Sequence, residues 1–110
     1  MAIELKGQKF PTDKLGYLLD YTQWDEELAL VMAKLDDFYL TEQHWEVIKF
    51  VRQFYLTYNT SPAIRALTKA MKAELGEDKA NSRYLFRLFP DGPAKQATKY
   101  AGLPKPKRCL

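Results

Sequence analysis

Apolar residues recur every three or four positions along much of this sequence, which is the spacing of one face of an α-helix. One such stripe follows Asp25, a good N-cap residue. A second follows Ser61 and Pro62, a typical helix start, and ends at Gly76. The two stripes consist of Leu28, Val31, Met32 and Leu35, and of Ile64, Leu67, Met71 and Leu75. We expect both to face a common core.

A longer helix is predicted between Thr41, its N-cap, and about Tyr58. Its apolar and aromatic residues cover most of the circumference, and a helix of this kind belongs in the middle of a fold. His44, the only histidine, lies near the start of this helix. It has no second histidine and no nearby cysteine, so it does not indicate a metal site.

Two shorter helices and a hairpin complete the prediction. Apolar and polar residues alternate on both sides of Gly7, which indicates a small β-hairpin at residues 3–10. One helix starts near Asn81, and a last one runs from Ala94 to about Ala101. The sequence therefore predicts a mainly α fold, with about five helices in a compact orthogonal bundle, a small N-terminal β-hairpin and a flexible C-terminal arm.

We divide the chain into one helical domain, residues 1–100, and a C-terminal arm, residues 101–110. Gly102 can adopt the left-handed conformation that ends a helix, and Pro104 and Pro106 hold the backbone extended. At about 3.1 Å per residue, such an arm extends roughly 28 Å from the domain. It can therefore carry a side chain near its end into a pocket on another protein.

The only cysteine, Cys109, lies second from the end of this arm. Lys105, Lys107 and Arg108 are nearby cations that favour a thiolate, while the terminal carboxylate opposes them. The sequence offers no glycine-rich phosphate loop, no metal-binding set and no histidine close to Cys109. Any chemistry therefore runs through Cys109 without a cofactor, and the partner supplies the rest of the site. The alternative is a cysteine without function on a disordered tail.

Composition narrows the class of protein further. A single cysteine excludes an internal disulfide, and a free thiol fits a reducing compartment, so we expect a soluble cytoplasmic protein. No apolar stretch is long enough to span a membrane. Residues 83–110 carry seven Lys and Arg against Asp91 alone. Such a basic segment indicates an acidic partner surface, a phosphate backbone or simply a solvated face.

The helix pair around residues 59–62 allows a different interpretation. Arg65, Thr68, Lys69 and Lys72 line the second helix of the pair, which matches the outline of a helix-turn-helix reader of nucleic acid. Any antiparallel helix pair gives the same outline, and acidic residues follow at once. A nucleic-acid-binding regulator, in which Cys109 is incidental, is therefore the alternative function.

Several long motifs resemble the TusE/DsrC family of sulfur-relay proteins. They occur in the family's order, they end on the penultimate cysteine, and the resemblance covers nearly the whole chain. The motifs are NTSPAIR at residues 59–65, NSRYLFRLFP at 81–90, GPAKQAT at 92–98 and AGLPKP at 101–106.

This resemblance implies a small helical sulfurtransferase, monomeric when free, whose Cys109 accepts sulfur as a persulfide from a TusBCD-like complex. It further implies that the sulfur passes to an MnmA-like enzyme, which thiolates the wobble uridine of its bound tRNA. Gly102, Pro104, Lys105, Pro106 and Arg108 are then the arm and its possible docking residues. Family members that act with dissimilatory sulfite reductase have a second cysteine at the position of Thr98, so its absence here favours the tRNA branch.

Overall fold

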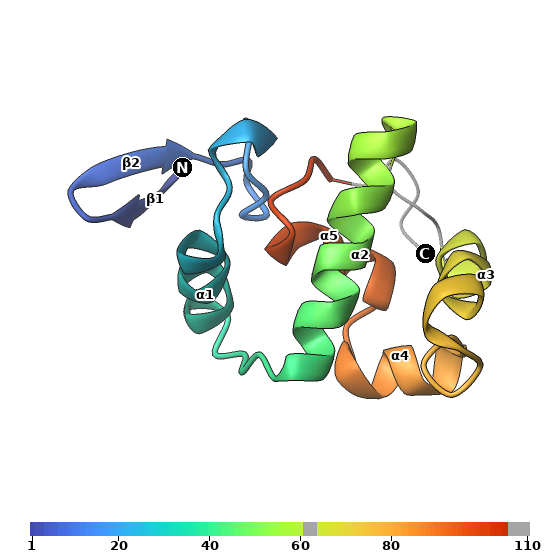
Figure 1. The fold of residues 1–110 in the computed structure, drawn as a ribbon. Helices are drawn as coiled ribbons and strands as arrows, with labels where there is room; N and C mark the ends of the chain where they lie inside the picture. The colour runs from blue at the N-terminus through green and yellow to red at the C-terminus, as the bar shows by residue number, and fades with distance from the viewer. Residues whose placement is uncertain (61–63, 106–110) are drawn as a thin grey trace.

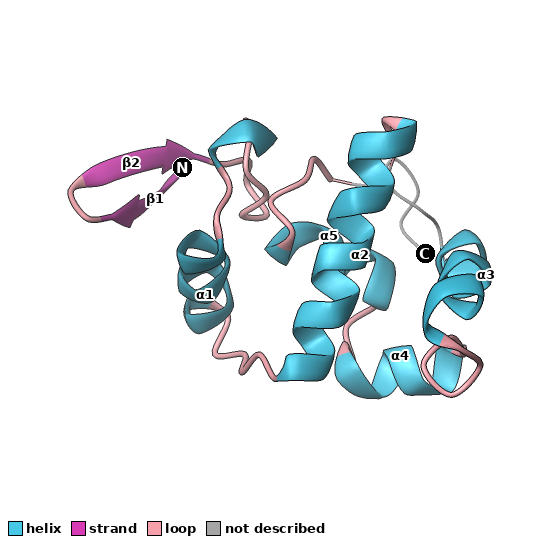
Figure 2. Ribbon diagram, in the orientation of Figure 1, coloured by secondary structure: helices cyan, strands magenta, loops and turns pink. Residues whose placement is uncertain are grey.

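The computed structural model describes residues 1–60 and 64–105 of the chain. Over these residues the fold is mainly α, with five α-helices behind a two-stranded hairpin, as predicted (Figures 1 and 2). The elements are β1 (Ala2–Leu5), β2 (Gln8–Pro11), a 3-10 turn η1 (Tyr21–Gln23), α1 (Glu26–Leu35), α2 (Glu42–Tyr58), α3 (Ile64–Leu75), α4 (Ser82–Leu88) and α5 (Pro93–Tyr100).

The N-terminal hairpin follows from its turn and from two inward side chains. Lys6 and Gly7 have φ angles of 52° and 78°, the left-handed pair that a tight two-residue hairpin turn requires. Ile3 pairs with Phe10 across the strands, and both side chains are buried in the core. Because β1 lies against α1, the hairpin gains the packing partner that an isolated pair of strands lacks.

Local capping residues set the helix boundaries as the sequence predicts. The Asp25 carboxylate accepts the Leu28 N–H at 2.8 Å, and the Asn81 side chain accepts the Tyr84 N–H at 2.8 Å. Gly76, with φ 88°, follows the last residue of α3. The predicted cap at Ser61 and Pro62 lies outside the described residues.

The element at the centre of the bundle is α5, not the long helix α2 as predicted. Helices α1, α2, α3 and α4 all contact α5, which lies between them in Figure 1. Small residues such as Ala94 and Ala97 allow these helices to approach closely, and both are buried. Helix α2 is buried on one face only, at His44, Val47, Ile48 and Val51, and its end at Tyr58 is 64% exposed. The prediction was wrong because it counted the aromatic residues near the end of α2 as buried, whereas Tyr58 is largely exposed.

One further core prediction is wrong. Leu35 is 70% exposed, because α1 turns the face containing Ala29 and Ala33 inward together with Leu28 and Met32.

Polar contacts link α2 to the chain at both ends of α4. Lys79, just before α4, donates to both carboxylate oxygens of Glu46 at 2.9 and 3.0 Å. At the other end, Nε2 of His44 lies 2.7 Å from the Leu88 carbonyl oxygen. Because Nδ1 of His44 accepts the Thr41 N–H at 3.0 Å, the proton belongs on Nε2, which donates to Leu88. His44 is thus a buried structural bridge.

Candidate functional site

The predicted arm leaves the domain at the end of α5, where the chain makes a Schellman turn. The Leu103 N–H donates to the Thr98 carbonyl at 3.2 Å, and the Gly102 N–H donates to the Lys99 carbonyl at 3.0 Å. Gly102 has φ 71°, the left-handed conformation that this turn needs. Leu103 follows with no exposed surface and anchors the turn in the core. We call Tyr100–Leu103 the root of the arm.

Trp24 covers this root from the segment that precedes α1. Its indole N–H donates to the Tyr100 carbonyl at 2.7 Å. A Cβ atom placed on Gly102 would lie 2.6 Å from Cγ of Trp24, closer than real atoms approach. Glycine is therefore required at position 102 for two reasons, the backbone conformation and the ring above it.

Arg52 of α2 binds the root from the other side. One guanidinium nitrogen donates to the Ala101 carbonyl at 2.9 Å, and the other donates to the Tyr21 carbonyl at 3.0 Å. The guanidinium carbon lies 4.5 Å from the centre of the Trp24 ring, which is a cation–π contact. Partial burial lowers the pKa of Arg52 below its ordinary value, although a guanidinium stays protonated. With these contacts, every carbonyl from Thr98 to Ala101 has a partner.

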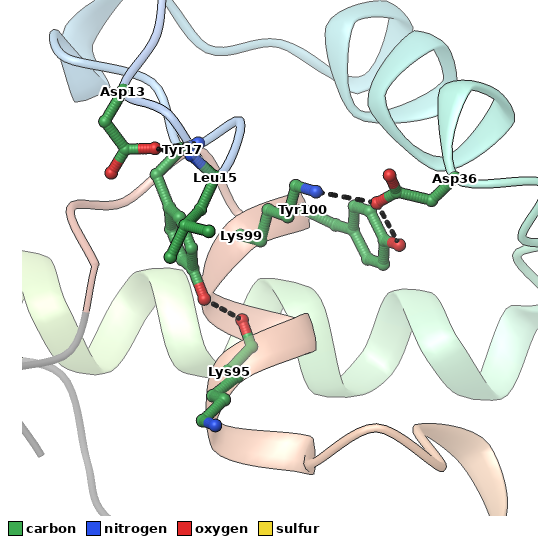
Figure 3. A network of polar contacts seen from close by, with 7 residues as sticks. All are labelled: Asp13, Leu15, Tyr17, Asp36, Lys95, Lys99 and Tyr100. Atoms are coloured by element: carbon green, nitrogen blue, oxygen red, sulfur yellow. Dashed lines mark hydrogen bonds and ion pairs between the residues drawn. The ribbon is translucent and has the colours of Figure 1, made fainter. Parts of the chain in front are cut away.

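A second polar network holds α5 from the side of α1 (Figure 3). Oδ2 of Asp36 accepts hydrogen bonds from Nζ of Lys99 and from the Tyr100 hydroxyl, each at 2.8 Å. Tyr17 adds a hydrogen bond from its hydroxyl to the Lys95 carbonyl at 3.2 Å. Burial raises the pKa of Tyr100 well above its ordinary value, and the hydrogen bond to Asp36 raises it further.

The predicted site residues fall into three groups. Gly102 belongs to the buried root, and the exposed part of the arm begins at Pro104 and continues at Lys105. The predicted boundary after residue 100 therefore falls within the root, three residues before the exposed part of the chain. Pro106, Arg108 and Cys109 lie outside the described residues. Lys99 is paired with Asp36, so it does not add a free charge to the basic C-terminal segment.

Sequence reasoning missed Trp24 and Arg52 as partners of the arm. The indole of Trp24 meets a carbonyl 76 residues away, and nothing in the local pattern indicates that pairing. A signal for Arg52 was present, since it is a cation within a mainly apolar part of α2. Such a residue needs partners for its buried donors.

Residues 1–60 and 64–105 contain no cluster of three or more histidine, cysteine or acidic side chains that could hold a metal ion. None of the helices described is long and apolar enough to cross a membrane. Both ring nitrogens of His44 are engaged in the fold.

The fold and the root define a small helical domain whose C-terminal segment leaves the core after Leu103. The sequence matches the DsrC-like protein family over residues 4–110. The chain belongs to this family.

Three relatives illustrate the match. A protein of Pectobacterium atrosepticum named Sulfurtransferase TusE is 59% identical over 98% of this chain and 99% of its own length. The solution structure of Allochromatium vinosum DsrC is 50% identical, with a TM-score of 0.89 over 99% of this chain and 97% of that protein. The oxidized gamma-subunit of the dissimilatory sulfite reductase (DsrC) from Archaeoglobus fulgidus is 39% identical, with a TM-score of 0.84 over the whole of both chains.

Proposed function

We propose that this protein accepts a sulfur atom on Cys109 and passes it to an enzyme that thiolates tRNA. The observation that carries the proposal is the likeness, 59% identical and nearly full length, to relatives named Sulfurtransferase TusE. The root supports it, because Trp24 and Arg52 hold the start of the arm in place while Pro104 and Lys105 are exposed. The protein is a sulfurtransferase that works as a relay.

The chemistry is a thiolate exchange at sulfur. The Cys109 thiolate attacks the outer sulfur of a persulfide on the donor, the donor's S–S bond breaks, and the donor cysteine leaves as a thiolate. Cys109 then holds the outer sulfur as a persulfide of its own. In the acceptor enzyme this outer sulfur is transferred onward and the Cys109 thiolate is restored. The exchange needs no added oxidant, reductant or cofactor.

The partners of this relay are a TusBCD-like donor complex and an MnmA-like enzyme with its bound tRNA. The cations Lys105, Lys107 and Arg108 suit an acidic entrance to a partner's active site or the phosphates of the tRNA there. We place the relay in the cytoplasm, where a free thiol stays reduced, and propose that the free carrier is a monomer.

The two alternative functions fit less well. Partnership with a sulfite reductase is disfavoured because Thr98 stands where such family members have a second cysteine, which could expel the sulfur as a disulfide forms. For the helix-turn-helix interpretation, a groove of about 820 Å³ lies between α2 and α3. Glu46, Glu74 and Lys49 are its charged lining residues, and their net negative charge is unfavourable to a phosphate backbone.

Replacement of the cysteine tests the proposal directly. The variant Cys109→Ser should fold normally, with a change in stability below about 0.5 kcal/mol, because we expect a side chain near the end of the predicted arm to contribute little packing. Incubation with a persulfide donor should add one sulfur atom to the parent and none to the variant, as measured by mass spectrometry. Continued sulfur transfer by the serine variant in a reconstituted relay would remove Cys109 from the mechanism.

The length of the arm gives a second test. Deletion of Lys105 and Pro106 shortens the arm by roughly 6 Å at polyproline spacing. Transfer to the acceptor enzyme should fall steeply, while the rate of Cys109 alkylation by iodoacetamide stays at the parent value. Equal transfer by the shortened protein would show that reach is unimportant.

A further inference from the structure

Arg52 is unusual among the cations of this protein, because its partners are two backbone carbonyls and an aromatic ring. Within the part of the chain that the structure describes, no carboxylate forms an ion pair with it. Holding a guanidinium partly out of water without a counter-ion is unfavourable, as the lowered pKa of Arg52 reflects. The fold nevertheless maintains this contact in the middle of α2.

The two carbonyls belong to segments that are far apart in the sequence. Ala101 lies in the root of the arm, and Tyr21 lies in η1, three residues before Trp24. Arg52 therefore links the root to the segment that carries Trp24, and its guanidinium lies beside the same indole ring that covers Gly102. The planar fork of arginine can reach two carbonyls at once, which the ammonium of a lysine cannot do in the same geometry.

The orientation of the Ala101–Gly102 peptide sets the direction in which the chain leaves α5. Arg52 binds the carbonyl of this peptide, and Trp24 binds the carbonyl of the peptide before it. These are the last hydrogen bonds from side chains to the described backbone before the exposed residues Pro104 and Lys105. The two residues therefore hold two successive peptide groups just before the exposed part of the chain.

We propose that Arg52 is a positioning residue for sulfur transfer, which fixes the direction of the arm by binding the Ala101 carbonyl. The functional half of this proposal rests on the proposed relay through Cys109. A loosened root spreads the thiol over more directions, so productive entry into a partner's site becomes rarer. The intrinsic reactivity of the thiol is unaffected, because Arg52 acts only through the backbone.

The first experiment measures the root itself and needs no sulfur transfer. In Arg52→Met, which keeps an apolar stem, amide hydrogen exchange at Gly102 and Leu103 should accelerate at least about tenfold, since a hydrogen bond to a charged group no longer holds the root closed. The amide of Met71 in α3 serves as the internal reference for global stability. A nitroxide on Cys109, the only thiol, should broaden a wider range of amide signals on the domain than in the parent.

Lys49→Met is the matched control, because it removes the same charge from the same helix. Lys49 is exposed, and its one ion pair among the described residues is with Glu26, at 3.6 Å. Both root measurements and sulfur transfer should stay at the parent values in this control.

Arg52→Lys retains the charge but loses the planar guanidinium that reaches both carbonyls. Its hydrogen exchange and sulfur transfer should therefore lie between those of the parent and those of Arg52→Met. Full activity and a closed root in Arg52→Lys would overturn the bridging role.

The second experiment measures transfer from a persulfidated carrier to the acceptor enzyme. For Arg52→Met, kcat/KM should fall at least about fivefold, while iodoacetamide alkylates Cys109 at the parent rate. Unchanged hydrogen exchange at Gly102 and Leu103 would overturn the proposal, and so would a loosened root with parent-level transfer. If the parent protein itself transfers no sulfur, the relay is wrong, and the exchange and nitroxide measurements still decide whether Arg52 fixes the root.

Discussion

Gly102 is the residue at which the geometry of the arm tolerates least change. Its φ of 71° is unfavourable for any other residue, and Trp24 occupies the space that a side chain would need. We expect Gly102→Ala to lower the free energy of unfolding by about 2–5 kcal/mol, the sum of left-handed backbone strain and forced displacement of the ring. Urea denaturation of the parent and the variant measures the loss.

Gly76 provides a control that separates the two causes. It also has a left-handed φ, 88°, but a Cβ atom there would meet nothing within 4 Å. Gly76→Ala should therefore show only the backbone term, about 1–2 kcal/mol. Equal losses in the two variants would mean that Trp24 moves aside freely and does not restrict the root.

Thr98, unlike Gly102, is a residue whose replacement should stabilise the fold. Its side chain is fully buried, and within the described residues its hydroxyl oxygen has no hydrogen-bond partner. Thr98→Val should raise the free energy of unfolding by about 1 kcal/mol, because a buried polar group without a partner is replaced by an apolar group of similar shape. Thermal or urea unfolding checks this.

The serine variant at the same position is the control. Thr98→Ser keeps the hydroxyl and removes one buried methyl group, so it should destabilise by about 1 kcal/mol. A valine variant no more stable than the parent would indicate that the hydroxyl finds a partner in solution.

At the level of elements, the attachment of α4 depends on His44. His44→Ala leaves the Leu88 carbonyl and the Thr41 N–H without their partners and opens a cavity beside Phe38 and Phe89. We expect a loss of about 2–4 kcal/mol in urea denaturation. Gln43→Ala, the exposed neighbour, should change stability by less than about 0.5 kcal/mol. A similar, small effect of both changes would contradict the bridging role of His44.

The helices and the hairpin could be predicted because their signals are local. Asp25, Asn81 and Gly76 cap or end helices through bonds to residues a few positions away. The central place of α5 could not be predicted in this way, because it depends on how closely four other helices approach its small side chains.

The same distinction between local signals and long-range contacts applies to the site. Gly102 was predictable as the end of a helix, since that role depends only on backbone conformation. Its enclosure by Trp24 and Arg52 depends on contacts between residues that are 76 and 49 positions apart, respectively. A single sequence holds no local trace of such pairings.

For the whole molecule, Tyr100 links stability to high pH. Its pKa in the folded protein is raised, whereas an unfolded tyrosine loses its proton near pH 10. The unfolded state therefore binds fewer protons above pH 10. The contribution of Tyr100 to stability is constant below that pH and should fall above it by up to about 1.4 kcal/mol per pH unit. Urea denaturation between pH 8 and about pH 11.5 measures this slope.

Tyr100→Phe separates this effect from general alkaline unfolding. The variant loses the hydrogen bond to Asp36, so it should be less stable at pH 8 by about 1 kcal/mol. Its stability should then decline less steeply above pH 10. Burial also raises the pKa of Tyr84, so the stability of the variant should still fall with pH above pH 10, but less steeply than that of the parent. Parallel curves for the two proteins would show that Tyr100 ionises as easily when folded as when unfolded.

The burial of Leu103 has a consequence for how tightly the carrier must bind its partners. Cys109 is the sixth residue after this anchor, and six residues can span at most about 20 Å. Confined to a volume of that radius, the thiol has a local concentration on the order of tens of millimolar around a docked domain. In the proposed relay through Cys109, a brief and weak encounter is then enough for sulfur transfer, and weak docking lets the protein dissociate quickly from one partner before it binds the next.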